Sequence, residues 1–328
     1  MINTDCSKRR SKVKPFLSII IVSYKVKELL KNCLNSLLAH PPRVSFETII
    51  VDNNSGDSTI AMLKDSFPWA KVIANGANLG FAKANNIGIK ASRGEFVLLL
   101  NPDTVVLPNT LDKMLSFMRA HPDVGVCGCR IVDQDGNIQP SCGRFPTPKL
   151  VVPHLFGLHK RISKVRSFYM SDWNHASNRI VDWVCAACFL TRRKIIDSIG
   201  LLEENLFLYG EEMDWCSRMS AEKWKTAYYS ESAIIHYGGE SISQIKKTRV
   251  LDRTNYMLLY VSLYHYLSKF YGKSTTNTVR FMITILIFLN VPLTFFSAFI
   301  RPKNSTIRLR RSVSLLRIAF MNMHILKY

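Results

Sequence analysis

Acidic side chains and one histidine are spaced along this sequence in a pattern that could perform chemistry. Carboxylates can hold Mg²⁺ or Mn²⁺ and share that ion with phosphate oxygens, and a further carboxylate can act as a general base. A histidine can add a metal ligand. The residues with this potential are Asp52, Asp103, Glu211, Glu212, Asp214 and His236.

Two of these carboxylates follow apolar segments that read as buried strands. Asp52 comes directly after 46–51, and Asp103 follows the run 96–100 and a short Asn-Pro turn. Ligands of open α/β sheets bind at the carboxyl ends of strands. A plain turn also explains Asp103, whereas a carboxylate fixed at a sheet edge suits a metal ion.

The turns that contain Asp52, Asn78 and His236 could line the same site. Asp52 either caps its turn or accepts a hydrogen bond from the N–H of a uracil or thymine ring. Asn78 and Gly80 enter the next helix at the same predicted edge, although amides there often serve only as caps. His236 precedes two glycines, which let the backbone approach a phosphate closely; a lone histidine at a strand end is otherwise structural.

A third acidic group opens a predicted helix. Glu211 and Asp214 share a face of that helix, whereas Glu212 points about 100° away from them. Carboxylates in a first helical turn are favoured by the helix dipole, so capping explains part of the group. Three acids exceed what capping needs, and a carboxylate is the usual base for an attacking hydroxyl.

Strand-like and helix-like segments alternate up to residue 131 and must position these side chains. Such alternation predicts an α/β fold with a mostly parallel central sheet covered on both faces. The long segment 133–180, rich in Pro, Gly, Asn and Ser, is a candidate acceptor loop or lid. The predicted strands are 17–22, 46–51, 71–74, 96–100 and 124–127, and the predicted helices are 27–38, 58–66, 81–91 and 109–121.

The net charge of +20 is concentrated at the ends of the chain. Residues 1–14 carry five Lys/Arg against one acid, and residues 251–328 carry eleven against one, so the ends supply +14. A nucleic-acid groove would place this charge on the folded body, among stacking aromatics. The distribution therefore favours anionic membrane lipids as partners and argues against nucleic acid.

An uncharged apolar segment of 20 residues, Phe281–Ile300, matches the length needed to cross a bilayer. Basic residues flank it on both sides, which conflicts with a simple crossing, and Pro292 should kink a helix there. We expect a kinked re-entrant or in-plane membrane segment. A single span and a buried soluble helix are the alternatives.

The eight cysteines are expected to be reduced, because no secretory signal opens the chain and the cytoplasm keeps thiols reduced. The pairs Cys127/Cys129 and Cys185/Cys188 could together form a zinc site. Both pairs lie in strand-like apolar runs, so buried small side chains are the interpretation we favour.

Taken in their order along the chain, the strand-end and helix-start motifs resemble those of family 2 glycosyltransferases, in particular bacterial rhamnosyltransferase-like members. The resemblance covers about 17–241 and implies a GT-A type nucleotide-sugar-binding fold, a nucleoside-diphosphate sugar donor and Mg²⁺ or Mn²⁺ as cofactor. The segments that carry it are SIIIVSYK, IIVDNNSGDST, NLGFAKANNIGI, LLLNPDTVV, LFLYGEEMDWCSR and HYGGES.

The resemblance also assigns roles. Asp103 and His236 would bind the metal; the family's D-x-D element reads Asn101-Pro102-Asp103 here, which leaves one carboxylate. In the family's E-D-x-D helix the second acid is the base, and this chain has Glu212 there, one methylene longer than aspartate, so Glu211 and Asp214 stay catalytic candidates. The nucleotide-sugar-binding set is Ser23, Tyr24, Asp52, Asn54, Asn78, Gly80 and Asn101.

Together these observations predict three parts: a basic tail at 1–15, a GT-A domain at 16–243, and a basic helical region at 244–328 that contains the apolar segment. The expected activity is inverting transfer of a sugar, with rhamnose implied by the resemblance, to a lipid-linked or oligosaccharide hydroxyl in cell-surface polysaccharide synthesis. The expected location is the cytoplasmic face of a bacterial inner membrane. The alternative is a membrane-tethered nucleotide-sugar-binding protein without catalysis.

Overall fold

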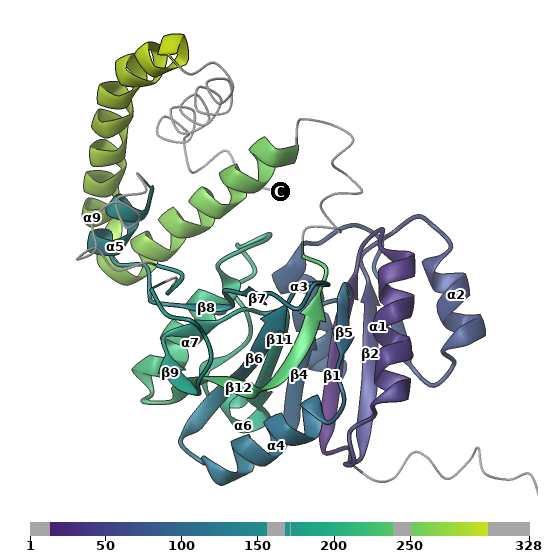
Figure 1. Ribbon diagram of the computed structural model, residues 1–328. Coiled ribbons are helices and arrows are strands. Elements are labelled where there is room, and N and C mark those ends of the chain that lie inside the picture. The colour runs from purple at the N-terminus through teal and green to yellow at the C-terminus, as the bar shows by residue number, and fades with distance from the viewer. Residues whose placement is uncertain (1–13, 156–167, 171, 239–250, 301–328) are drawn as a thin grey trace, which may run out of the picture.

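The computed structural model describes residues 14–155, 168–170, 172–238 and 251–300 (Figure 1). The predicted basic tail lies almost wholly outside these residues, as do 301–328. The described chain builds a central sheet in the strand order β3-β2-β1-β4-β11-β6-β12-β5. Helices cover both faces of this sheet, and a long C-terminal helix extends away from it (Figure 1).

One half of the sheet is wholly parallel, as the alternating pattern predicts. Its strands β1 and β4 are largely apolar and are buried along almost their whole length. Parallel registers pair Ser23 with Asp52 and Asp52 with Ala74, so these strands end together. The strands are β1 (Leu17–Ser23), β2 (Phe46–Asp52), β3 (Lys71–Ala74) and β4 (Phe96–Leu100).

The other half makes the sheet mixed. β11 (Cys188–Arg192) runs antiparallel to both β4 and β6 (Val124–Val132), while β12 (Lys225–His236) is parallel to β6. From its sequence this stretch reads as two short strands, 227–229 and 233–236, whereas β12 is continuous. A register shift between Tyr229 and Ala233 separates the two apolar stretches. Past this irregularity, β12 pairs antiparallel with β5 (Thr104–Val106).

Two hydrophobic cores flank the sheet because side chains alternate along β1. Ile19 and Ile21 belong to the core under α1, α2 and α4, whereas Ile20 belongs to the core under α3, α6 and α7. The bounds of these helices are α1 Lys27–Ala39, α2 Thr59–Ser66, α3 Phe81–Ala91, α4 Thr110–Ala120, α6 Arg193–Ile199 and α7 Glu211–Ala221.

The segment 133–180 is less irregular than its composition predicts. It contains one helix and several two- or three-residue strands, and residues 156–167 and 171 lie outside the description. The elements here and just beyond are β7 (Ile138–Gln139), β8 (Cys142–Gly143), α5 (Pro148–Leu155), β9 (Arg179–Val181) and β10 (Trp183–Val184). β8 pairs with β10 as a small second sheet, β7 extends β6, and β9 pairs with β12.

The C-terminal helix α9 (Leu251–Ile300) breaks into two arms at Gly272, where φ is 83° and ψ is 160° (Figure 1). A small core closes the vertex, where Tyr264 and Leu267 of the first arm pack with Ile283 of the second and with Val151 of α5. Pro292, where the sequence predicts a kink, lies in the second arm, and the helical assignment continues through it to Ile300.

At the start of the apolar segment 281–300, Phe281 and Phe288 are exposed. Across the described part of the chain, no helix meets the length and apolarity required of a bilayer span.

Candidate functional site

The nucleotide-binding candidates gather where β1 and β2 end. Ser23 and Asp52 are register partners, and both are buried. The Asp52 carboxylate accepts two bonds from Ser55, from its backbone N at 3.0 Å and its Oγ at 2.5 Å. Each carboxylate oxygen has further lone pairs, so the turn-capping role leaves acceptor capacity for a ligand N–H. Tyr24 is half-buried beside them, and Asn54 is exposed with φ at 63°.

The buried amide in this turn is Asn53, which the sequence analysis did not single out. Its Nδ2 donates to Asn78 Oδ1 at 2.9 Å and to the Gly80 carbonyl at 3.2 Å. Its Oδ1 accepts from Asn75 Nδ2 at 2.9 Å and from the Leu79 backbone N at 3.2 Å. Asn53 therefore ties the end of β2 to the loop that enters α3, and Asn78 serves this network.

Gly80 is held against the loop that leads to α7. Its φ is 81°, which L side chains rarely adopt, and a Cβ there would lie 2.6 Å from the Phe207 carbonyl oxygen. The next residue, Phe81, donates its backbone N–H to the same carbonyl at 2.8 Å. Gly80 thus joins the nucleotide side of the site to the acidic side through the backbone.

Replacing Gly80 by alanine should destabilise the protein by about 1–3 kcal/mol, because the new Cβ would be strained and would strike backbone rather than a flexible side chain. Urea unfolding would measure the loss. Gly136→Ala is the matched control: its φ is 82°, yet nothing lies within 4 Å of the added Cβ. Equal losses in the two variants would mean that the contact with Phe207 contributes nothing.

The two metal-ligand candidates lie side by side. His236 Nε2 is 3.3 Å from Asp103 Oδ1, and the Tyr237 backbone N donates to the Asp103 carbonyl at 3.0 Å. This juxtaposition follows from the sheet, because His236 at the end of β12 is the register partner of Thr104. Asn101 Nδ2 is 3.5 Å from His236 Nε2, so the end of β4 reaches the same place.

The residues present fit a divalent metal that is shared with a ligand. Asp103 is 3% exposed and offers a hard oxygen, and His236 offers a nitrogen beside it. Within the described residues no group of three or more His, Cys, Asp or Glu side chains could hold a metal alone. Mg²⁺ is commonly bound by one or two carboxylates with phosphate oxygens and water, so a diphosphate would supply the remaining ligands.

Of the carboxylates that open α7, Glu211 and Asp214 are buried and Glu212 is half-buried. Gly210, in the left-handed region with φ at 88°, is the N-cap, and Tyr209 before it has φ at 70°. Burial raises the pKa of Glu212 to about 7, and burial and then the charge of Glu212 raise the pKa of Glu211 well above its usual range. Among the described residues, the buried Glu212 Oε2 has no hydrogen-bond partner, so it is available to a ligand proton.

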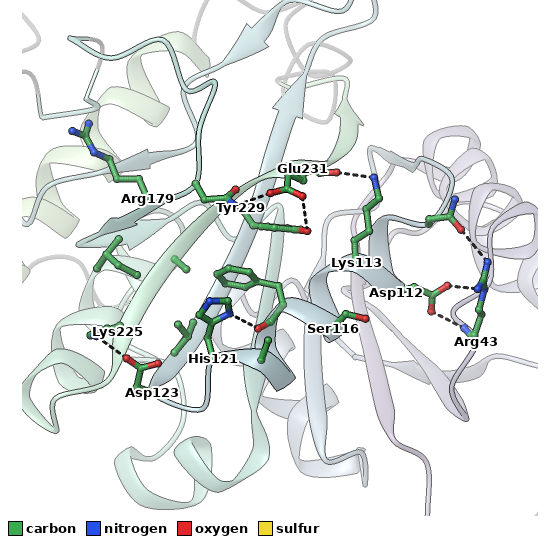
Figure 2. A pocket seen from close by; sticks show the side chains of 17 residues that line it. Arg43, Asp112, Lys113, Ser116, His121, Asp123, Arg179, Lys225, Tyr229 and Glu231 are labelled. Atoms are coloured by element: carbon green, nitrogen blue, oxygen red, sulfur yellow. Dashed lines mark hydrogen bonds and ion pairs between the residues drawn. The ribbon is translucent and has the colours of Figure 1, made fainter.

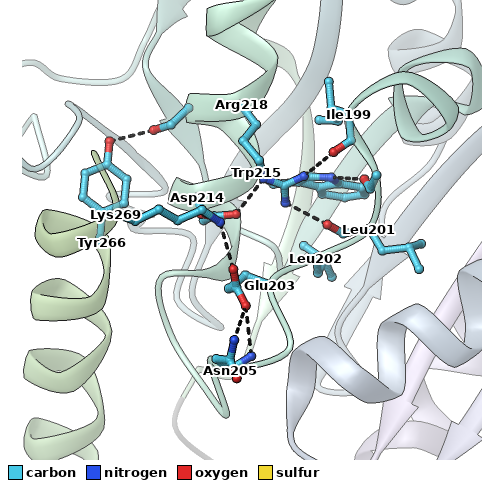
Figure 3. A network of polar contacts seen from close by, with 12 residues as sticks. Ile199, Leu201, Leu202, Glu203, Asn205, Asp214, Trp215, Arg218, Tyr266 and Lys269 are labelled. Carbon is cyan, nitrogen blue, oxygen red and sulfur yellow. Dashed lines mark hydrogen bonds and ion pairs between the residues drawn. The ribbon is translucent and has the colours of Figure 1, made fainter. Parts of the chain in front are cut away.

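Asp214, the third acid, belongs to a network of ion pairs (Figure 3). Its Oδ2 lies 2.8 Å from Arg218 Nε and its Oδ1 lies 2.6 Å from Lys269 Nζ. Arg218 also donates to the carbonyls of Ile199 at 2.6 Å and Leu201 at 2.7 Å. The structure thus gives Asp214 a role in holding α7, its preceding loop and α9 together.

Cys185 shows that the metal pair and the α7 acids share one region. Burial raises the pKa of its thiol to about 12, and the charges of Glu212, Glu211 and Asp103 all contribute in the same direction. Two residues on, the Ala187 carbonyl accepts from the Asn101 backbone N at 3.0 Å. The β10–β11 connection therefore lies between the end of β4 and α7, a position that sequence spacing does not reveal.

Tyr169 is a further neighbour that the sequence did not indicate. It packs edge-on against Trp183 with ring centroids 5.8 Å apart. Burial and then the charge of Glu212 raise the pKa of its phenol to about 12. Its segment lies in the latter part of 133–180, where the sequence has no helical or strand periodicity.

The paired cysteines lie mostly in the core. Cys127, Cys129 and Cys188 are buried, and Cys185 is intermediate. Burial raises the pKa of Cys127 well above its usual range, which makes it a poor metal ligand because zinc binds thiolates. This placement agrees with the interpretation of buried small side chains.

A hollow of about 830 Å³ lies elsewhere, between α4 and the β9–β12 edge (Figure 2). Phe117 and Tyr229, which both line it, stack with ring centroids 4.6 Å apart, and the lining residues Lys225 and Asp123 form an ion pair. None of the site residues predicted from the sequence lines it.

Comparison with known proteins agrees with this arrangement. The family model described as glycosyl transferase family 2 matches residues 18–200. An N-acetylglucosaminyl-diphospho-decaprenol L-rhamnosyltransferase of Mycobacterium tuberculosis is 28% identical over 239 residues, covering 69% of this chain and 77% of the relative. Rhamnosyltransferase WbbL of Escherichia coli is 23% identical over 228 residues, covering 67% of this chain and 82% of the relative.

Among solved structures, the mannosyltransferase PcManGT from Pyrobaculum calidifontis, in complex with GDP-Man and Mn²⁺, has a TM-score of 0.55. The match covers 96% of this chain and 89% of that chain at 13% identity. At such identity the similarity shows a shared fold.

Proposed function

The chain belongs to glycosyl transferase family 2, and from this we propose that it is an inverting, metal-dependent glycosyltransferase. It moves a sugar from a nucleoside-diphosphate donor to a lipid-linked saccharide hydroxyl, in the synthesis of a cell-surface polysaccharide. Two relatives named as rhamnosyltransferases support rhamnose as the sugar, and one of them carries an N-acetylglucosaminyl-diphospho-decaprenol in its name, which supports the lipid-linked acceptor.

One observation carries the proposal: the pair Asp103 and His236 and the half-buried Glu212 lie around a single segment at the carboxyl edge of the sheet. Asp52 and Ser23 end neighbouring strands at the same edge. A nucleoside bound at the ends of β1 and β2 would extend its diphosphate toward Asp103. The sugar would then lie between the metal pair and α7.

In this geometry Glu212 accepts the proton of the acceptor hydroxyl as that oxygen attacks the anomeric carbon of the donor. The bond from this carbon to the diphosphate breaks on the opposite face, so the sugar inverts and no covalent enzyme intermediate forms. A pKa near 7 lets Glu212 be ionised and still basic at neutral pH. Asp103 and His236 would hold Mg²⁺ or Mn²⁺, which supplies charge neutralisation to the leaving phosphates.

The membrane part of the proposal rests on charge and exposed apolar surface. Positive charge gathers at the chain ends, and the second arm of α9 exposes Phe281, Ile285 and Phe288. These features support contact with anionic lipids at the cytoplasmic face of a bacterial inner membrane, where the lipid-linked acceptor would be reached.

The full chain, incubated with Mn²⁺ and a panel of nucleoside-diphosphate sugars, should show thermal stabilisation by one donor class. With a lipid-linked diphospho-saccharide acceptor, it should release the nucleoside diphosphate and form a glycoside of inverted anomeric configuration, measured by NMR. Donor binding without any turnover would favour a non-catalytic binding protein. Stabilisation by no nucleotide sugar would refute the donor assignment.

A further inference from the structure

The first arm of α9 packs on the helix that carries the proposed base. Ser262 Oγ donates to the Leu208 carbonyl at 3.2 Å, and an added Cβ on the N-cap Gly210 would lie 3.1 Å from Ser262 Cβ. One helical turn further, the hydroxyls of Tyr266 and Ser217 are 2.6 Å apart. Contacts therefore run along α7 from its N-cap to its second turn.

Lys269 forms the charged part of this contact (Figure 3). Its Nζ lies 2.6 Å from Asp214 Oδ1 and 2.8 Å from Glu203 Oε2. The Asp214 side chain is 1% exposed, so its charge needs a partner on each oxygen, and Arg218 occupies the other one. Lys269 thus joins α9 at once to α7 and to the loop before it.

Glu203 is fixed as firmly as Asp214. Burial acts to raise its pKa, but hydrogen bonds from Lys269 and Asn205 outweigh burial and lower the pKa to about 2. Asn205 donates to Glu203 Oε1 through its Nδ2 at 2.8 Å. The loop 203–210 is consequently tied at Glu203 by Lys269 and at Leu208 by Ser262.

We propose that Lys269 is a positioning residue for the transfer reaction: by pairing with Asp214 and Glu203 it fixes the start of α7, and with it the Glu212 carboxylate, relative to the donor. This inference rests on the proposed function. Glu212 lies one half-turn before Asp214 in the same helix, so a shift of α7 displaces both. The nucleotide side, at the ends of β1 and β2, is held by contacts of its own, such as those of Asp52 and Asn53.

Lys269→Met keeps the length of the side chain but removes its charge. We expect kcat to fall about 100-fold, the scale of a misplacement of roughly 1 Å, while the donor KM stays within about twofold. Lys269→Arg, which keeps the charge, should recover most of kcat. Lys273→Met, an exposed lysine on the second arm of the same helix, is the matched control and should leave kcat unchanged.

The test includes a readout that a loss of folding would not produce. In the Lys269→Met background the Asp214 Oδ1 has lost its cationic partner, and Asp214→Asn removes that negative charge, so the double variant should be no slower than Lys269→Met alone if the two residues act as a unit. Thermal unfolding of every variant checks that the assay temperature lies below Tm. Parallel losses in kcat and donor binding, with no recovery in Lys269→Arg, would overturn the positioning role.

An unchanged kcat in Lys269→Met would also overturn the positioning role of Lys269. The wild-type chain and Glu212→Gln are measured beside these variants to separate the two claims. Wild-type transfer that Glu212→Gln abolishes upholds the proposed function whatever Lys269 does. A wild-type chain that turns over no donor and acceptor would refute the proposed function, and the inference with it.

Discussion

Glu212→Gln is expected to lower kcat for sugar transfer by about 10³-fold, within the range that general bases contribute. The amide keeps the size of the side chain but cannot take the acceptor proton. Donor binding, measured by calorimetry with the nucleoside diphosphate and Mn²⁺, should change by less than about threefold, because the ion pair partners and the nucleotide turn are untouched. Loss of donor binding instead would assign Glu212 to the nucleotide site.

The matched variant is Glu212→Asp. The family pattern carries an aspartate at this position, so a shortened carboxylate should retain part of the activity that the amide loses. If both variants were equally inactive, reach rather than proton transfer would explain the loss. If both were fully active, Glu211 would become the candidate base.

The raised pKa of Glu212 sets the direction in which kcat and stability change with pH. Burial raises the pKa of Glu212 to about 7, so kcat should rise with pH through this value as the base ionises. The folded state binds this proton more tightly than the unfolded state, whose carboxyl has a pKa of about 4.3. Stability is therefore lost as pH rises from about 4.3 through 7. Glu212→Gln should accordingly raise Tm at pH 8, by about 2 °C.

Asp103→Ala should weaken Mn²⁺-dependent donor binding by about 100-fold, because it removes the carboxylate of the pair that would hold the metal; even outer partners of metal ligands are worth 10–100-fold. The substitution leaves His236 alone at a position where the described residues offer no third ligand. Titration of the nucleoside diphosphate with and without Mn²⁺ gives the metal-dependent part. Wild-type protein in EDTA should match the variant.

Asp103→Asn is the isosteric companion. It keeps the volume beside His236 but offers a neutral amide in place of the charged oxygen, so it should resemble the alanine variant in metal dependence and the wild type in Tm. A metal titration indistinguishable from wild type in both variants would remove Asp103 from this role. An equal loss in the absence of metal would point instead to a direct contact with the nucleotide.

The parts of the fold that the sequence predicts are those where local pattern and burial coincide. The run 96–100 becomes β4, and the α/β alternation up to residue 120 gives the parallel half of the sheet. The resemblance to the glycosyltransferase family, drawn from ordered motifs, is confirmed by the family match over 18–200. The mixed half was beyond such reasoning, because β11 inserts between β4 and β6 from a distant part of the chain.

The site follows the same division. Asp103 and Glu212 can be identified from the sequence. Asp103 is a carboxylate just after a buried strand, and Glu212 is one of three acids in a single first helical turn, which is more than capping needs. Cys185 and Lys269 do not, since their importance comes from contacts across long sequence separations. The break in α9 at Gly272 was not predicted from the sequence; glycine's freedom at positive φ decides the geometry there.

The loop that joins the end of β2 to α3, beside the proposed nucleoside, is held by neutral groups. Asn53, Asn75 and Asn78 bind one another and the neighbouring backbone through amides that neither titrate nor carry net charge. The shape of this end of the cleft should therefore be indifferent to acidity and ionic strength over the physiological range. Any sensitivity of donor affinity to those conditions would arise at the charged groups, which are Asp52 beside the base and the pair Asp103 and His236 that would hold the metal.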